Sequence, residues 1–156
     1  MKELKNALLI FIVLSVLCGI MYPFLMTGIA QIFFPKQANG SLITVDGTVI
    51  GSELIGQAFT STRYFQGRPS AVNYDAGNSG GSNLGPLNPK LTEQVGENLK
   101  QVRTANGLAA SSEVPADLVL ASASGLDPHI SVEAALLQVE RVAQARGLAK
   151  EKVQEL

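Results

Sequence analysis

The sequence predicts a single N-terminal transmembrane helix followed by a small α+β extracytoplasmic domain. No charged residue occurs between Lys5 and Lys36, although 16% of the 156 residues are charged. From Lys36 onward the charged residues return, and their net charge of −2 is typical of a soluble surface. Beyond that point a hairpin pattern precedes two helical patterns without regular strand–helix alternation, which favours an α+β domain.

Composition excludes several classes of function. The chain has 12 basic and 13 acidic residues, which leaves no basic footprint for nucleic acid. Its single cysteine, Cys18, lies in the apolar stretch, so the polar part has neither disulfides nor a cysteine-ligated zinc site. There is one histidine, His129, and no metal-ligand cluster or pair of catalytic carboxylates is visible. The residues therefore favour a domain without metal and without catalysis.

Residues 7–34 form the predicted transmembrane helix, which exceeds the ~20 residues needed to cross a bilayer. Pro23 predicts a kink near its middle. Two signal-peptide interpretations compete with a retained anchor. Leu17 precedes Cys18 where lipoprotein processing requires a small residue, and the apolar stretch before the small residues at 28–30 is too long for a secretory signal. A retained anchor is therefore preferred.

The charges that flank this helix predict its orientation. Lys2, Lys5 and the amino terminus outnumber Lys36 on the other side. Positive flanks stay in the cytoplasm. Residues 1–6 are therefore predicted to be a cytoplasmic tail, and residues 35–156 to be extracytoplasmic.

Small residues suggest a partner-facing side of the helix. Ser15, Gly19 and Thr27 recur at multiples of four, and small side chains at such spacing let another helix approach closely. The alternative is that glycine and proline are simply common in membrane helices. Both interpretations remain open from the sequence.

The outer domain begins with a predicted hairpin. Two β-branched runs within residues 42–50 flank Asp46-Gly47, a turn pair whose glycine accepts positive φ. Residues 51–89 are rich in glycine and proline and show neither helical nor strand periodicity. They are predicted to form an ordered loop with short strands.

Two helices are predicted further on. Asn88 caps one that begins at Pro89 and ends at Asn106. Ser131 caps the other, which Gly147 ends. The residues of this second helix predicted to face inward are Val132, Ala135, Leu136, Val139, Val142 and Ala143. Those predicted to face outward are Glu133, Gln138, Arg141 and Gln144.

Two stretches have the residue types of known chemistry. The glycine-rich residues 79–85 could cradle a phosphate, but they lack the Lys-Ser/Thr ending of a nucleotide loop, and a tight ordered turn explains them as well. Ser122, Ser124, Asp127 and His129 are the residue types of a hydrolase. The glycines of a nucleophile elbow are missing there, and an ordinary turn before the helix is the simpler interpretation.

An aromatic and arginine cluster is the remaining candidate site. Tyr64, Phe65 and Arg68 lie within five positions of one another. Aromatic and arginine side chains anchor protein interfaces, and they also complete small cores. The sequence leaves partner docking and core packing equally open.

The order of the motifs resembles the KdpC family, the C chain of the bacterial potassium-transporting ATPase. The matching stretches are PKQANGSL (35–42), GSELIGQ (51–57), YFQGRPSA (64–71), SGGSNL (79–84), Asn88-Pro89, ASASGLDPHIS (121–131) and RVAQARGL (141–148). The resemblance covers nearly the whole chain. Members of the family usually continue past Leu156, so this chain looks truncated relative to the family.

The resemblance implies a high-affinity potassium-uptake complex of the bacterial inner membrane. Its other members are a channel-like potassium-translocating subunit, a P-type ATP-hydrolysing subunit and a small single-helix subunit, and membrane lipid surrounds them. The C chain is implied to be a non-catalytic accessory subunit needed for assembly. It is also described as a catalytic chaperone that raises the ATP affinity of the hydrolysing subunit, a role linked to the glutamine that matches Gln57.

An extracytoplasmic domain conflicts with direct contact to ATP, so the assembly role is preferred. The chain is predicted to bind no cofactor by its own chemistry, and ATP would be reached through the hydrolysing subunit. Two functions from other classes stay open. One is a membrane-anchored hydrolase that uses Ser122 or Ser124, and the other is a secreted binding protein that begins at Gln31.

Overall fold

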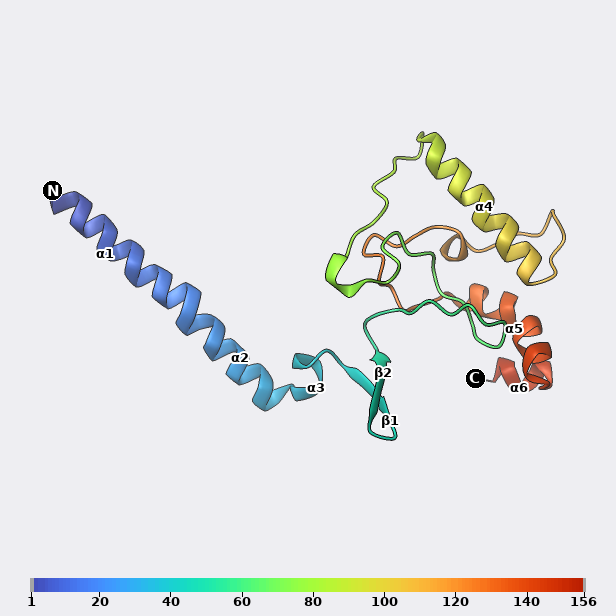
Figure 1. Cartoon of the computed structure of the whole chain (residues 1–156), viewed down its shortest axis with the longest axis horizontal. Coiled ribbons are helices and arrows are strands. Elements are labelled where there is room, and N and C mark those ends of the chain that lie inside the picture. Colours follow the sequence, from blue (N-terminus) through green and yellow to red (C-terminus); the bar gives the residue numbers. More distant parts are fainter. Residues whose placement is uncertain (1, 156) are drawn as a thin grey trace. The chain divides into compact units, whose positions relative to one another are not determined.

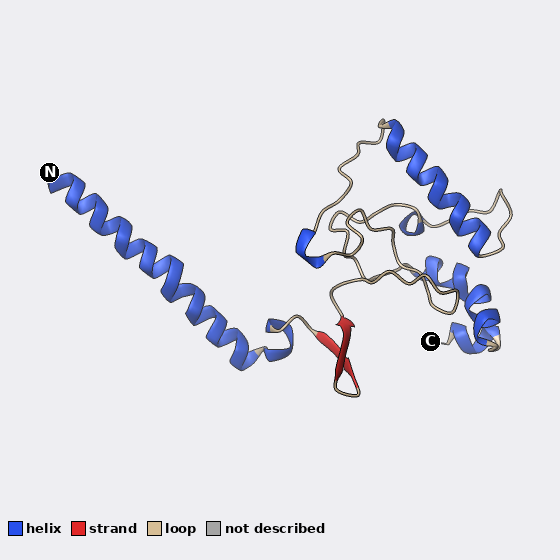
Figure 2. Cartoon of the chain, in the orientation of Figure 1, coloured by secondary structure: helices blue, strands red, loops and turns tan. Residues whose placement is uncertain are grey.

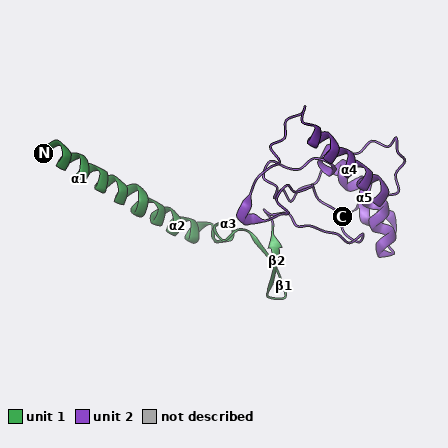
Figure 3. Ribbon diagram, turned by 45° about the horizontal axis from the view of Figure 1, so that its top comes forward, with its two compact units in different colours: residues 1–52 green, residues 53–156 purple. Residues whose placement is uncertain are grey.

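The computed structural model describes residues 2–155 and forms two compact units, Met1–Ser52 and Glu53–Leu156 (Figures 1 and 3). Met1, the first residue of the predicted tail, and Leu156, the last residue of the predicted domain, lie outside the described residues. The first unit contains the helix and the hairpin, and the second contains the remaining helices and loops. By its contacts, the hairpin therefore belongs to the same unit as the long apolar helix.

One long helix runs from Lys2 to Phe33, which confirms the predicted N-terminal apolar helix. It consists of α1 (Lys2–Val16), a π-helical turn (Leu17–Met21) and α2 (Tyr22–Phe33). The backbone N–H of Tyr22 donates to the carbonyl of Leu17, five residues back, as a π turn requires. Pro23 has no N–H to donate. A π turn therefore lies just before this proline, where the sequence predicted a kink.

The hairpin forms as predicted. A short helix, α3 (Pro35–Ala38), leads into β1 (Leu42–Val45) and β2 (Thr48–Ser52), which pair antiparallel (Figure 2). Asp46 and Gly47 have φ of 49° and 79°, the positive values of a type I′ turn. The register shifts by one residue between Ile43 and Thr44, which marks a β-bulge.

The second unit consists of helices joined by long ordered loops (Figure 2). The helices are α4 (Pro89–Ala105), α5 (Val132–Arg146) and α6 (Lys150–Gln154), and single 3₁₀ turns occur at Ala76–Asn78 and Ala116–Leu118. The predicted caps are confirmed. The Asn88 side chain accepts the N–H of Lys90, and the Ser131 hydroxyl accepts the N–H of Ala134.

A small aliphatic core lies between α5 and α6. Val139, Val142 and Ala143 of α5 pack with Val153 of α6, and Phe65 from the loop before Gly67 packs against them. Gly147 adopts φ of 65° and ends α5, so that the chain can turn back into α6. The predicted stop at this glycine is confirmed.

The predicted orientation of α5 is wrong at four positions. Val132 and Leu136 were expected inside but are 71% and 51% exposed. Gln138 and Arg141 were expected outside but are only 1% and 7% exposed. The physical reason is that both polar side chains find backbone partners in a distant loop, so every nitrogen and oxygen of the two side-chain polar groups has a hydrogen-bond partner.

Backbone hydrogen bonds join the loop that contains Gly56 and Gly80 to the later loop at residues 124–126. Gly56 N–H donates to the carbonyl of Leu126 and Gly80 N–H donates to that of Ser124, both at 2.8 Å. A Cβ on Gly56 would lie 2.7 Å from the carbonyl oxygen of Asp127, so only glycine fits this close approach. These bonds fix the loop that begins at residue 57.

Candidate functional site

The candidate site is the exposed loop of residues 57–64, called here the aromatic loop. It follows the buried Gly56 and runs to Tyr64, and all of its residues are exposed. Phe59 is 45% exposed and Tyr64 is 47% exposed. Their ring centroids lie 5.4 Å apart at an interplanar angle of 41°, a tilted aromatic pair. The loop therefore displays two interacting aromatic rings at the surface.

Two arginines of α5 hold the end of this loop by its backbone. Nη1 of Arg141 donates to the carbonyls of Thr62 (2.6 Å) and Tyr64 (3.1 Å). Nε of Arg146 donates to the carbonyl between them, that of Arg63 (2.6 Å). Three consecutive carbonyls are thus bound by cationic donors, which form stronger hydrogen bonds than neutral ones. The aromatic loop is therefore fixed against α5.

The buried amide of Gln138 extends this attachment. Its Oε1 accepts the backbone N–H of Gln66 (2.8 Å) and Nη2 of Arg141 (2.7 Å). Its Nε2 donates to the carbonyls of Gln66 and Ala134, both at 3.1 Å. Nε of Arg141 reaches the side-chain oxygen of Asn106 just past α4 (2.9 Å). Because all four hydrogen-bonding positions of the Gln138 amide are filled, its burial is fully compensated.

Burial lowers the pKa of the Arg141 guanidinium below its ordinary value. The four acceptors that contact it are neutral oxygens rather than carboxylates. The cation is therefore stabilised by backbone and amide dipoles, and it stays charged because the ordinary pKa of arginine is so high.

Arg146 also contacts the aromatic surface directly. Its Cζ lies 5.3 Å from the centroid of the Tyr64 ring, within the range of a cation–π interaction. Arg63 is exposed next to Tyr64. The aromatic pair is therefore accompanied by the Arg146 guanidinium, and the exposed Arg63 adjoins Tyr64 in the sequence.

The three residues proposed for docking at this cluster lie in different environments. Tyr64 is at the surface, whereas Phe65 packs on the α5–α6 core. Arg68 turns inward, where Nη1 pairs with Oδ2 of Asp127 at 3.0 Å. Its Nη2 donates to the carbonyls of Leu120 and Ala121. Of the three residues, Tyr64 alone presents its side chain as a docking residue would.

Gln57 lies at the start of the aromatic loop and is exposed. It follows Gly56, whose backbone is tied to Leu126. The residue implied in ATP affinity therefore belongs to the same exposed loop as Phe59 and Tyr64.

The hydrolase-like residues form a turn. Oδ1 of Asp127 accepts the backbone N–H of His129 and lies 3.1 Å from its Nδ1, while Arg68 pairs with the other oxygen. These contacts lower the pKa of Asp127, with the backbone N–H of His129 as the largest cause. The hydroxyls of Ser122 and Ser124 accept backbone N–H groups of the same turn. Within residues 2–155 no hydrogen bond joins either serine to His129, whose side chain is 82% exposed.

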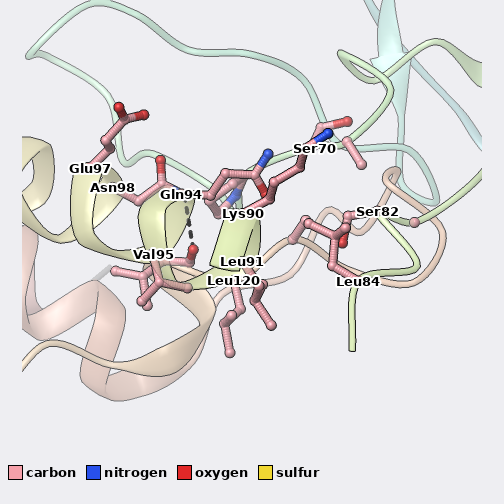
Figure 4. A pocket seen from close by; sticks show the side chains of 15 residues that line it. Ser70, Ser82, Leu84, Lys90, Leu91, Gln94, Val95, Glu97, Asn98 and Leu120 are labelled. Atoms are coloured by element: carbon pink, nitrogen blue, oxygen red, sulfur yellow. Dashed lines mark hydrogen bonds between the residues drawn. The ribbon is translucent and has the colours of Figure 1, made fainter. Parts of the chain in front are cut away.

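The glycine-rich stretch lines one side of a groove of about 460 Å³. Figure 4 shows its walls, with α4 residues on one side and Ser82 and Leu84 on the other. A Cβ on Gly81 would lie 3.0 Å from the carbonyl of Ala123, so this glycine allows two backbones to pack closely. Lys90 and Glu97 both border the groove, which gives it mixed charge rather than the positive character a phosphate site needs.

Comparison with known proteins places the chain. A model of the KdpC family, described as the c chain of the K⁺-transporting ATPase, matches residues 4–156. The chain belongs to the KdpC family. It is therefore a subunit of a potassium-transporting ATPase, as the resemblance predicted.

Curated relatives support the assignment over nearly the whole chain. A potassium-transporting ATPase KdpC subunit of Caldanaerobacter subterraneus subsp. tengcongensis is 53% identical over 155 residues, which cover 99% of this chain and 80% of the relative. One of Geobacter sulfurreducens is 56% identical over 153 residues, 96% of this chain and 79% of the relative. A third relative, from Rhodopseudomonas palustris (strain BisB5), is 51% identical, and the match covers 83% of its length.

Sequence reasoning missed the residues that hold and complete the surface of this KdpC-family chain. Gln138 and Arg141 have the spacing of solvent-facing positions on an amphipathic helix, and the sequence did not single out Phe59 or Arg146 as site residues. One signal was available. A glutamine and an arginine three residues apart on a helix can share a hydrogen bond, as Oε1 of Gln138 and Nη2 of Arg141 do.

Proposed function

We propose that this chain is a non-catalytic accessory subunit that is anchored in the bacterial inner membrane and helps the potassium-uptake complex to assemble. Its partners would be the channel-like potassium-translocating subunit, the P-type ATP-hydrolysing subunit and the small single-helix subunit. The N-terminus would be cytoplasmic and the main domain extracytoplasmic. One observation supports this most. The apolar helix Lys2–Phe33 has 32 residues, and none of its most apolar window is buried within the chain.

An uncovered apolar helix of this length needs lipid or partner helices around it. The π turn bears on which side faces a partner. In a plain α-helix, twelve residues would leave Ser15 and Thr27 about 120° apart. The π turn between them holds one residue more than an α turn, which brings them to within about 20°. Ser15, Gly19 and Thr27 thus fit one helix face, on which the Thr27 hydroxyl donates to the carbonyl of Pro23.

Copurification from membranes with a tagged copy tests the assignment. The expected result is recovery of two larger membrane proteins together with ATPase activity stimulated by potassium. Recovery of the chain alone, from membranes in which the other subunits are expressed, would contradict an accessory role.

The proposed helix face has a matched pair of variants. Gly19 and Gly28 both have no atom within 4 Å of an added Cβ inside the chain, yet Gly28 lies about 120° from Ser15 by the same helical arithmetic. Gly19→Leu should reduce copurification, and Gly28→Leu should leave it unchanged. Equal yields of complex from the two variants would show that the face of Ser15, Gly19 and Thr27 does not bind a partner helix.

A second proposed role is to raise the ATP affinity of the hydrolysing subunit. It is supported by the exposure of Gln57 on the aromatic loop. Gln57→Ala in the assembled complex should raise KM for ATP while kcat stays unchanged, because binding rather than chemistry is affected. Gln94→Ala, an exposed glutamine on α4, is the control. If both variants keep the wild-type KM, this role is lost while the assembly role stands.

A further inference from the structure

The aromatic loop is held in one conformation before any partner arrives. Arg141 and Arg146 bind the carbonyls of Thr62, Arg63 and Tyr64 at 2.6 to 3.1 Å. Residues at the centres of protein interfaces gain affinity when they are ordered in advance, because little conformational entropy is then lost on binding. The backbone bonds therefore serve to present the exposed side chains of the loop.

The exposed side chains have the composition of an interface centre. Phe59 and Tyr64 form a half-exposed aromatic pair, and the Arg146 guanidinium lies over the Tyr64 ring. Tyrosine and arginine are enriched among the residues that contribute most to protein binding, and phenylalanine is enriched at interfaces. Among residues 2–155 no carboxylate forms an ion pair with Arg63 or Arg146. Arg146 over the Tyr64 ring and Arg63 next to Tyr64 in the sequence thus have no acidic ion-pair partner within the described chain.

We propose that Phe59, Tyr64, Arg63 and Arg146 together form a docking surface for a carboxylate-bearing, partly apolar segment of another subunit of the complex. This inference rests on the proposed function, since it assumes that the chain assembles with such subunits. The rings would cover apolar side chains of the partner. The guanidinium groups would bind its aspartate or glutamate, for which the planar fork of arginine is well suited.

A protein partner fits better than a lipid surface. Recognition of anionic lipid headgroups typically uses clusters of four to eight basic residues. Here two arginines stand in a part of the chain whose net charge is −2. Two cations suit one or two carboxylates rather than an extended anionic surface.

A photo-crosslinking residue at Thr60 tests the location of the partner. Thr60 is exposed and lies between Phe59 and Tyr64 in the sequence of the loop. In the assembled complex, irradiation should join this position to another subunit. The same residue at Lys100, which is exposed on α4, should give no such product. An intact complex in which Thr60 joins only lipid, or nothing, would overturn the inference and leave the accessory role standing.

Charge reversal tests the chemistry. Arg63 contributes its backbone carbonyl to the Arg146 bond, but its side chain is exposed, so Arg63→Glu leaves the attachment of the loop in place. It should weaken retention of the chain in the complex about tenfold, and more strongly at low salt. Lys100→Glu is the control with the same change of charge, and it should have no effect.

In the partner segment that crosslinks to position 60, replacing the aspartate or glutamate that contacts Arg63 with arginine should restore binding of the Arg63→Glu chain. The double change Phe59→Ala and Tyr64→Ala should also reduce retention tenfold or more, about what is lost at strong interface positions. Equal behaviour of Arg63→Glu and Lys100→Glu in an intact complex would refute the carboxylate partner. A wild-type chain that is recovered alone would overturn the proposed function and this inference together.

Discussion

Replacing Arg141 with methionine should destabilise the second unit severely. Arg141 is 7% exposed, and its guanidinium makes four hydrogen bonds of 2.6 to 3.1 Å. Two of its acceptors, the carbonyls of Thr62 and Tyr64, belong to exposed residues and can bond to water instead. The other two are the amide oxygens of Gln138 and Asn106. Each lost bond to a charged donor costs about 1.5–3 kcal/mol, so those two predict a loss of about 3–6 kcal/mol.

Methionine retains most of the apolar stem, so the loss should come from the hydrogen bonds rather than from a cavity. Thermal unfolding of the full chain in detergent micelles, followed by far-ultraviolet circular dichroism, measures it. The apolar helix stays hydrogen-bonded in the micelle, so the transition reports on the second unit. For a unit of this size, the predicted loss lowers Tm by about 12 °C or more.

Arg146→Met is the matched control, because Arg146 is exposed and donates one hydrogen bond, to Arg63. It should lower Tm by about 4 °C or less. If Arg141→Met melts within a few degrees of this control, the buried guanidinium does not hold the loop to the helix. The aromatic loop would then have to be held by other contacts than those of Arg141.

Three further predictions concern other parts of the chain. Gly56→Ala should destabilise the fold by about 1–3 kcal/mol, because the new Cβ would lie 2.7 Å from a carbonyl oxygen. Gly96→Ala in α4, where nothing lies within 4 Å, should instead raise Tm, and equal shifts would contradict the packing argument. Because contacts lower the pKa of Asp127, its carboxylate stabilises the fold above the ordinary aspartate pKa of about 4, and this stabilisation is lost as pH falls further. Asp127→Asn should therefore melt below wild type at about pH 7, and the difference should shrink as the pH falls below about 4; a difference that stays constant into acid would refute this. In a Cys18→Ser background, Ser112→Cys should react with a membrane-impermeant maleimide on intact cells, and labelling only after permeabilisation would reverse the proposed orientation.

Local signals in the sequence predicted the local structure. Asp46-Gly47 predicted the hairpin turn, Asn88 and Ser131 predicted helix starts, and Gly147 predicted a helix end. Each of these depends on backbone geometry within a few residues. Such geometry is set by the residue itself, by its φ preference or by a side chain that reaches the nearest N–H groups. The long apolar helix is equally local, because it follows from composition alone.

The side chains that hold the candidate site could not be predicted in this way. Gln138 and Arg141 can be buried because they bond to the backbone of Gln66, Thr62 and Tyr64. These partners lie more than seventy residues earlier in the chain. Helical periodicity assigns a polar residue to the outside and contains no information about such partners. The alternatives of docking and core packing for the aromatic cluster were open for the same reason, since adjacent residues can point to opposite sides.

Because of the π turn from Leu17 to Met21, the number of residues in the long apolar helix can change at one place without rotating one half relative to the other. Because this turn already accommodates one surplus residue, deleting Ile20 should convert it to an ordinary turn and leave the two halves pointing as before. Deleting Leu25, outside the turn, would instead rotate Thr27 by about 100° and leave it about 80° from Ser15. The helix can therefore be shortened by one residue at this place while the relative directions of its two halves stay the same.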